Sequence, residues 1–194
     1  MRRKYTDESV KFFTSNDLAA LFAVIGNARD LAMALMSYTH GLRASEVGLI
    51  RLSDINLREK SVYIRRLKGS ISGSAPLLPV EFRAIKQWLR VRGKTPGPLF
   101  ISRQHRPISR HRLDDLVKGW GKLAGVDPER CHWHAFRHAT GTALAATEPL
   151  QQISWWMGHK SFRSSQWYLH QSLANLQAMG KRLEGFDFGR PVRG

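Results

Sequence analysis

The chain has 194 residues, 42% of them hydrophobic, which is typical of one folded domain and excludes an intrinsically disordered polypeptide. Its 31 Lys and Arg residues against 15 Asp and Glu give a formal net charge of +16, which favours nucleic acid as a partner, with a ribosome-associated or generally basic protein as the alternative. The single cysteine, Cys131, excludes an intramolecular disulfide framework and fits a reducing cytoplasm, and no apolar run is long enough to span a bilayer.

The first third of the chain is predicted to be helical after a basic, aperiodic arm at residues 1–13. Polar residues at 14–16 offer caps for the first helix, in which apolar residues recur at helical spacing. Three helices are expected in this part of the chain, at about residues 15–25, 30–41 and 44–49.

A β-hairpin is predicted next. The segment S-V-Y-I-R-R-L (61–67) alternates apolar and polar residues, K-G-S-I-S-G-S forms a Gly/Ser-rich turn, and A-P-L-L-P-V (75–80) follows. The tip of this hairpin should lie near Lys68 and Gly69.

Helical periodicity then returns and continues to the C-terminal region. The expected elements are a short strand, L-F-I, at 99–101 and helices at about 80–93, 109–123, 134–147, 150–157, 162–169 and 172–183. The prediction is therefore a mainly α protein with a small antiparallel β-sheet (α+β). We expect one domain at 14–194, preceded by the arm and including the tail helix at about 172–183.

The segment H-A-F-R-H (134–138) allows two interpretations. His134 and His138 are four residues apart, as two zinc ligands on a helix would be, but Ala135 stands where the metalloprotease pattern H-E-x-x-H has its glutamate. Arg137 between the histidines would also repel a cation, so we expect no metal site. Arg137 and His134 instead share one helical face and can bind two oxygens of a phosphate.

Three segments together resemble a known family. H-G-L-R-A-S-E-V-G-L-I (40–50) is similar to the first arginine box of the tyrosine recombinases, which include the phage integrases and fimbrial invertases. H-A-F-R-H resembles the H-x-x-R box of that family, and W-M-G-H-K-S-F-R-S-S-Q-W-Y-L-H (156–170) resembles its terminal box. The resemblance implies the tyrosine recombinase catalytic-domain fold and site-specific DNA strand transfer through a 3′-phosphotyrosyl intermediate, without metal, ATP or another cofactor.

The resemblance also implies which residues act on the scissile phosphate. Arg43 and Arg137 would clamp it, Tyr168 would be the nucleophile, and Lys68 would be the general acid that protonates the departing 5′-oxygen. A tyrosine hydroxyl has an ordinary pKa of about 10, so nearby cations and a base are needed to favour the phenolate. Each residue also has a structural alternative, such as a capping Arg43, a solvated Lys68 or a core Tyr168.

Further roles follow for residues around this clamp. His134 would bind a phosphate oxygen and assist proton movement at the tyrosine, and His159 would donate to another oxygen. Glu46 would orient an arginine, and His138 is expected to be structural.

Basic residues elsewhere are candidate DNA-backbone contacts, with a solvated surface as the alternative. They are Arg65, Arg66, Arg103, Arg106, Arg110 and Arg112. The partner would be double-stranded DNA at specific sites. The tail at about 172–183 is expected to dock on a neighbouring subunit, giving a homotetramer on paired sites, with a monomer as one state free in solution.

The resemblance leaves other interpretations open. A non-catalytic DNA-binding regulator with the same fold is one alternative, and a relaxing topoisomerase is another. We expect a bacterial or phage-encoded cytoplasmic protein of the mobile-element type. We expect no membrane partner and no separate core-binding domain such as the larger family members carry.

Overall fold

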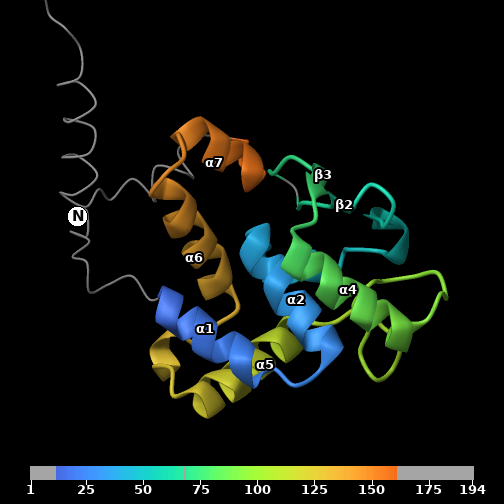
Figure 1. Ribbon diagram of the computed structural model, residues 1–194, viewed down its shortest axis with the longest axis horizontal. Helices are drawn as coiled ribbons and strands as arrows, with labels where there is room; N and C mark the ends of the chain where they lie inside the picture. Colours follow the sequence, from blue (N-terminus) through green and yellow to red (C-terminus); the bar gives the residue numbers. More distant parts are fainter. Residues whose placement is uncertain (1–11, 68, 161–194) are drawn as a thin grey trace, which may run out of the picture.

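The structure, a computed structural model, describes residues 12–67 and 69–160. Within these residues helices predominate, and a small three-stranded sheet lies at one side of the molecule (Figure 1). Helix α2 (Ala28–Thr39) packs against α4 (Pro79–Arg92) and α6 (His134–Ala145), and α1 (Ser15–Val24) packs against α5 (Arg110–Ala124). The predicted fold class, mainly α with a small antiparallel sheet, is confirmed.

The first two helices begin at side-chain caps. Thr14 and Asp17 form a reciprocal capping box at α1, with Asp17 N donating to Thr14 Oγ1 at 3.1 Å and Thr14 N donating to Asp17 Oδ2 at 2.9 Å. Helix α2 starts two residues earlier than expected because Asn27 is its cap and accepts a hydrogen bond from Asp30 N.

The sheet has the order β1–β2–β3 and is antiparallel throughout. Strand β2 (Ser61–Ile64) pairs with β3 (Gly73–Pro76) as the predicted hairpin, with Val62 opposite Ala75. Strand β1 (Ile55–Asn56) was not predicted, because two residues are too few to show an alternating pattern.

The remaining predicted elements are largely present. Helix α3 is shorter than expected (Ala44–Val47), α5 begins after its Ser109 cap, and α7 spans Leu150–Trp156. The expected strand at 99–101 is wrong, because residues 98–101 form only isolated bridges, Pro98 with Arg51 and Ile101 with Pro107, and no continuous ladder. The helices expected at 162–169 and 172–183 lie outside the described residues.

The core contains the apolar faces of all the larger helices. Its largest fully buried side chains include Trp133, Phe136, Met33, Leu42 and Ile50. Helix α5 approaches Cys131 so closely that a Cβ at Gly121 would lie 2.1 Å from the cysteine sulfur, which explains a glycine inside this helix. Among the described residues, no helix is long and apolar enough to cross a membrane.

Candidate active site

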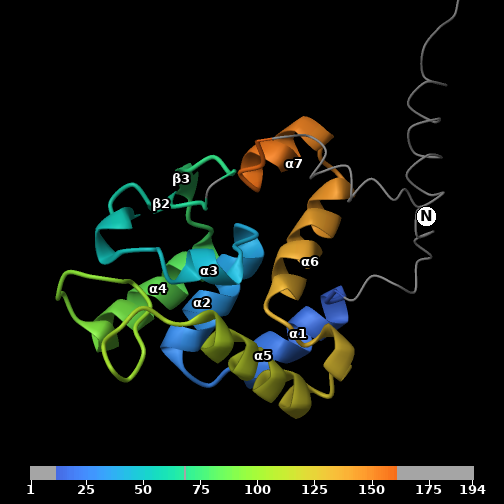
Figure 2. The same cartoon turned by 180° about the vertical axis from the view of Figure 1, so that it is seen from behind.

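Arg43 is held at the start of α3 by a buried carboxylate. Its backbone N–H donates to Glu46 Oε2 at 2.9 Å, and its Nη1 donates to Glu46 Oε1 and to Ser70 Oγ, both at 2.8 Å. The Glu46 side chain is fully buried, whereas the Arg43 side chain remains 32% exposed. The guanidinium of Arg43 is therefore oriented by the protein and still partly exposed. Helix α3, which begins directly after Arg43, lies on the side of the molecule seen in Figure 2.

Glu46 is ionised in this environment. Burial acts to raise the pKa of its carboxyl, but the charge of Arg66 and the hydrogen bonds from Arg43 and Arg66 outweigh burial and leave the pKa below its ordinary value. Glu46 therefore accepts hydrogen bonds from both Arg43 and Arg66 as a carboxylate.

The buried side chain of Arg137 forms hydrogen bonds with residues from other parts of the chain. Its side chain extends from α6 and is buried, with Nη1 donating to the carbonyl of Gly41 and Nη2 donating to Met157 O at 3.2 Å and to His159 Nε2 at 2.5 Å. Gly41 has φ +56°, a conformation that favours glycine, and a Cβ there would lie 3.0 Å from the Met157 side chain. This tight turn lets the 40–41 segment, α6 and the end of α7 meet at one guanidinium.

His159 is linked to both arginines, directly to Arg137 and through Ser70 to Arg43. Its backbone forms a β-bridge with Ser70, which is the residue that accepts from Arg43, and its ring accepts from Arg137. The sequence-predicted Arg43, Arg137 and His159 are therefore brought together, although they are far apart in the chain.

The histidines of the site are neutral at neutral pH in the free protein. Burial, followed by the charges of Arg137 and Arg43, lowers the pKa of His159 to about 4, and its Nε2 must lack a proton to accept from Arg137. Desolvation and then His138 and Arg137 lower the pKa of His134 to about 4, although His134 keeps an exposed edge. The rings of His134 and His138 meet edge to face at 4.7 Å.

Burial is also the main cause that lowers the pKa of His138 to about 4. His138 is half-buried beside His134, and its structural role stays a prediction. Two other sequence-predicted residues, Lys68 and Tyr168, lie outside the described residues. Leu67, the residue before Lys68, lies close to the site, because its N–H donates to Glu46 Oε1 at 3.4 Å.

A groove of about 560 Å³ opens beside Arg43 and His134. It lies between the start of α3, one face of α5 and the start of α6, and its polar lining includes Arg110, Lys118 and His132. Lys118 and His132 were not predicted as site residues. Lys118 follows Arg110 by eight residues on the same helix face, and this spacing could have identified it from the sequence.

The other predicted DNA contacts divide into exposed and interior side chains. Arg103, Arg106 and Arg112 are exposed near the start of α5. Arg65 is 44% exposed and forms a two-pronged pair with Asp54, at 2.9 Å and 2.7 Å.

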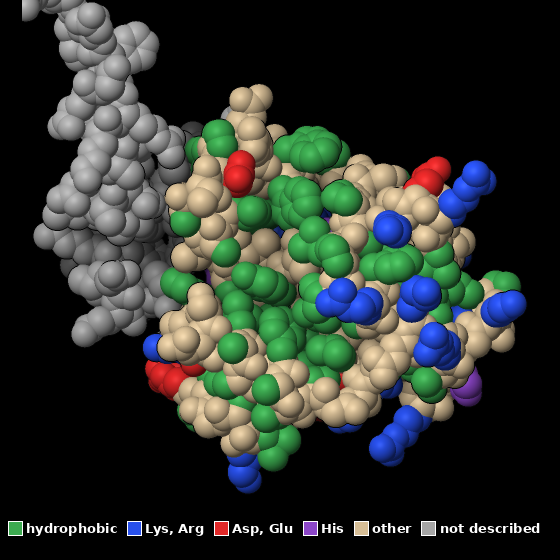
Figure 3. All heavy atoms as spheres, in the orientation of Figure 1, with side chains coloured by type: hydrophobic (Ala, Val, Ile, Leu, Met, Phe, Trp, Pro, Cys, Tyr) green, Lys and Arg blue, Asp and Glu red, His purple; other side chains and the backbone are tan. Residues whose placement is uncertain are grey.

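Arg66 differs from these, because its side chain is only 2% exposed and cannot reach a DNA backbone as placed. Figure 3 shows a further gathering of Lys and Arg side chains over α4, whose basic residues include Arg83, Lys86 and Arg90. The sequence analysis did not single out this surface.

Groups of three or more potential metal ligands are absent from the part of the chain that the structure describes. The site contains the oriented guanidiniums of Arg43 and Arg137, with neutral histidine rings near them and a basic groove beside Arg43. Such a site is suited to binding a phosphodiester and stabilising charge that develops on its oxygens.

Comparison with known proteins gives the family. Residues 11–174 match the model of the Phage integrase family. The chain is 32% identical to the type 1 fimbriae regulatory protein FimB of Escherichia coli (strain K12), over 95% of this chain and 96% of FimB. It is 31% identical to the tyrosine recombinase XerD of Xanthomonas campestris, over 89% of this chain and 58% of XerD. The chain belongs to the Phage integrase family, the tyrosine recombinases.

Solved structures share the fold. The XerA recombinase crystal structure superposes with a TM-score of 0.78 at 20% identity, covering 100% of this chain and 68% of XerA. The Tn1549 transposon integrase, in complex with transposon right end DNA, gives a TM-score of 0.74 at 20% identity, with coverage of 94% and 69%.

Proposed function

We propose that this protein is a site-specific recombinase that cuts and rejoins double-stranded DNA, with Tyr168 as its nucleophile. One observation carries the proposal: Arg43, Arg137 and His159 are joined through Ser70 and shared backbone contacts, and Arg43 also lines a basic groove. Membership of the Phage integrase family supports the same activity.

The arginines act on the non-bridging oxygens of the scissile phosphate. As the tyrosine oxygen attacks phosphorus, negative charge accumulates on these oxygens, and oriented cations stabilise that state more than the ground state. Glu46 and the carbonyl acceptors hold the guanidiniums in place before DNA arrives, so little reorganisation is needed during the reaction.

The proton movements follow from the same residues. Tyr168 loses its hydroxyl proton with the help of His134, and its oxygen forms a bond to phosphorus as the bond from phosphorus to the 5′-oxygen breaks. Lys68 protonates that leaving oxygen, giving a free 5′-hydroxyl and a 3′-phosphotyrosyl bond. The phosphodiester energy is conserved in this bond, so another 5′-hydroxyl can attack it and rejoin DNA without ATP or a metal ion.

The DNA is bound through the groove and the surrounding cations. Arg110 and Lys118 contribute to the groove, and Arg65, Arg103, Arg106 and Arg112 extend the basic surface. Four protomers assemble on paired sites through the tail at about 172–183, in a cytoplasmic protein of the mobile-element type. The Tn1549 integrase structures, which contain transposon DNA, support such a DNA partner.

A covalent-capture selection tests the activity and identifies the DNA site in the same experiment. The protein is incubated with a pool of nicked duplexes of randomised sequence, and denaturant-resistant protein–DNA adducts are recovered and sequenced. The wild-type protein should enrich a common sequence, and Tyr168→Phe should give no adduct because the attacking oxygen is absent.

Recovery of DNA binding without any adduct would favour a non-catalytic regulator. An equal adduct with Tyr168→Phe would refute the assignment of the nucleophile. Adducts with no sequence preference and no need for paired sites would indicate relaxation of DNA rather than site-specific recombination.

A further inference from the structure

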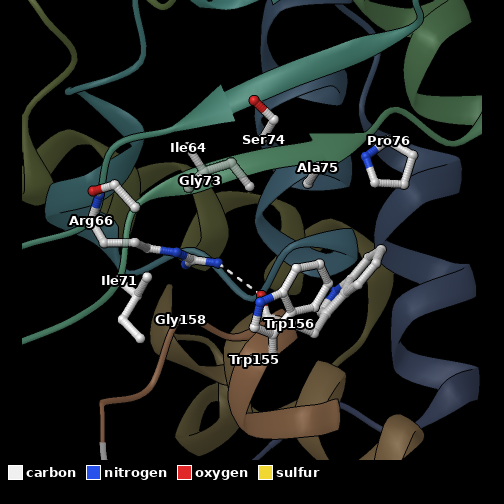
Figure 4. A pocket seen from close by; sticks show the side chains of 11 residues that line it. Ile64, Arg66, Ile71, Gly73, Ser74, Ala75, Pro76, Trp155, Trp156 and Gly158 are labelled. Atoms are coloured by element: carbon white, nitrogen blue, oxygen red, sulfur yellow. Dashed lines mark hydrogen bonds between the residues drawn. The ribbon is translucent and has the colours of Figure 1, made fainter.

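Arg66 lies in the connection between β2 and β3, near the expected tip of the hairpin, yet its side chain is buried. Its side chain points inward, between the hairpin and α7, as Figure 4 shows. Nη1 donates to Glu46 Oε2 at 2.9 Å, and Nη2 donates to His40 O at 2.8 Å and to Trp156 O at 3.2 Å. A single guanidinium therefore connects the hairpin, the turn before Arg43, helix α3 and the end of α7.

The contact with Glu46 links Arg66 to the clamp on the scissile phosphate. The two oxygens of this carboxylate each accept from one arginine side chain: Oε1 accepts from Arg43 Nη1 and Oε2 accepts from Arg66 Nη1. The backbone N–H of Arg43 also donates to Oε2, at 2.9 Å. Without Arg66, Oε2 of this fully buried carboxylate would lose its charged donor, and the balance of hydrogen bonds that sets the direction of the Arg43 guanidinium would change.

The contact with α7 links Arg66 to His159 as well. Gly158 packs directly on the arginine, since a Cβ at Gly158 would lie 3.0 Å from Arg66 Nε. Ile71 N donates to Gly158 O at 2.9 Å, which fixes the returning arm of the hairpin to the same segment. Arg66 thus touches the residue that immediately precedes His159.

We propose that Arg66 is a positioning residue, which sets Arg43 and His159 in their phosphate-binding geometry before DNA binds. The proposal rests on the proposed function, because it assigns Arg66 to the machinery of that reaction. Arg66 itself does not touch the DNA, since its guanidinium is enclosed by protein.

Lysine cannot replace Arg66 in this role. The planar guanidinium donates in separate directions, to a carboxylate from Nη1 and to two carbonyls from Nη2, whereas a lysine ammonium is a single point of charge. Arg66→Lys keeps the charge near Glu46 and should support folding, but it should not restore the alignment of the two segments.

The test uses single-turnover cleavage of a nicked duplex carrying the recognised sequence, with rates normalised to the fraction of active protein. Arg66→Lys and Arg66→Met should bind DNA as tightly as the wild type and cleave about 100-fold more slowly, the loss expected from a displacement of about 1 Å. The matched control is Arg92→Met, because Arg92 also donates to several backbone carbonyls, including Pro98 O at 2.7 Å, but lies away from the site. Arg92→Met should lose stability and cleave at the wild-type rate.

A second substrate separates positioning of the clamp from general loss of structure. A methylphosphonate at the scissile position removes one anionic oxygen, so alignment of Arg43 contributes less to its cleavage. The rate difference between wild type and Arg66→Lys should shrink to within about 10-fold on this substrate.

Several outcomes would overturn the positioning role. They are wild-type rates for Arg66→Lys, an equal defect on both substrates, or a rate loss in Arg92→Met that matches that of Arg66→Met. If Arg66→Met does not fold, Arg66→Lys decides the question on the same two substrates. Failure of the wild-type protein to cleave either substrate would instead refute the proposed function.

Discussion

Gly158 provides a direct test of how the hairpin is docked beside the active site. Its φ of +66° lies in the left-handed region, and an added Cβ would lie 2.8 Å from Ile71 O and 3.0 Å from Arg66 Nε. Gly158→Ala therefore combines backbone strain with a collision against the backbone of the hairpin. Because a main-chain oxygen cannot move aside alone, the hairpin arm itself has to shift.

The two costs can be separated with a matched glycine. Gly125, which ends α5, has φ +67°, and an added Cβ there would meet nothing within 4 Å. Left-handed strain alone should make Gly125→Ala unfavourable by ~1–2 kcal/mol. Gly158→Ala should lose a further ~1–3 kcal/mol from overpacking, or about 2–5 kcal/mol in total.

Urea unfolding gives the free-energy change, and single-turnover cleavage gives its consequence for the site. Gly158→Ala should lose more stability than Gly125→Ala, and it alone should slow cleavage, because its Cβ displaces the hairpin that carries Lys68. Equal losses of stability in the two variants, or normal cleavage by folded Gly158→Ala, would contradict the docking argument.

Two further predictions concern charge. The pKa of His159 falls from 6.5 to about 4 on folding, so between these pH values the unfolded chain binds a proton at this residue that the folded protein does not bind. The free energy of unfolding should therefore decrease as the pH drops from about 6.5 to 4, by up to ~3 kcal/mol. Urea unfolding across this range should show a shallower pH dependence for His159→Gln, and an unchanged dependence would count against the lowered pKa. Lys118→Ala should weaken DNA binding and reduce the magnitude of the slope of log affinity against log salt by about 1. Lys122, on the same helix, is outside the groove lining, so Lys122→Ala should change this slope less. Equal slopes for the wild type and Lys118→Ala would remove Lys118 from the DNA contacts.

The sequence predicted best the elements whose signals are local. Caps preceded the helices at Thr14 and Ser109, a Gly/Ser-rich turn separated the hairpin strands, and Pro149 marked the start of α7. Each of these features depends on hydrogen bonds or backbone preferences within a few residues. They could therefore be recognised independently of how the helices pack.

Contacts between distant segments could not be predicted in the same way. Arg65 and Arg66 are adjacent and identical in type, and both were expected to contact DNA. The structure leaves Arg65 partly exposed beside Asp54 and buries Arg66 against Trp156, which is 90 residues away. Alternation along β2 predicts that Arg66 lies on the side of the buried Val62 and Ile64 and that Arg65 lies on the opposite side. What Arg66 contacts on that side depends on the docking of α7 on the hairpin, which no local pattern encodes.

The electrostatics of the site give a physical reason for burying Arg66 beside Glu46. Arg43, Arg66 and Arg137 converge here, and Glu46 is the carboxylate that Arg43 and Arg66 share. Concentrating positive charge in a partly buried site is unfavourable in the free protein. Burial, and after it the charges of Arg137, Arg43 and Arg66, lower the pKa of His159. A phosphate relieves the repulsion among these charges, and the relief is greatest when charge on its oxygens is highest, in the transition state. In the proposed role, Arg66 contributes positive charge from a buried position, so the residues that orient the site would outnumber those that touch the phosphate.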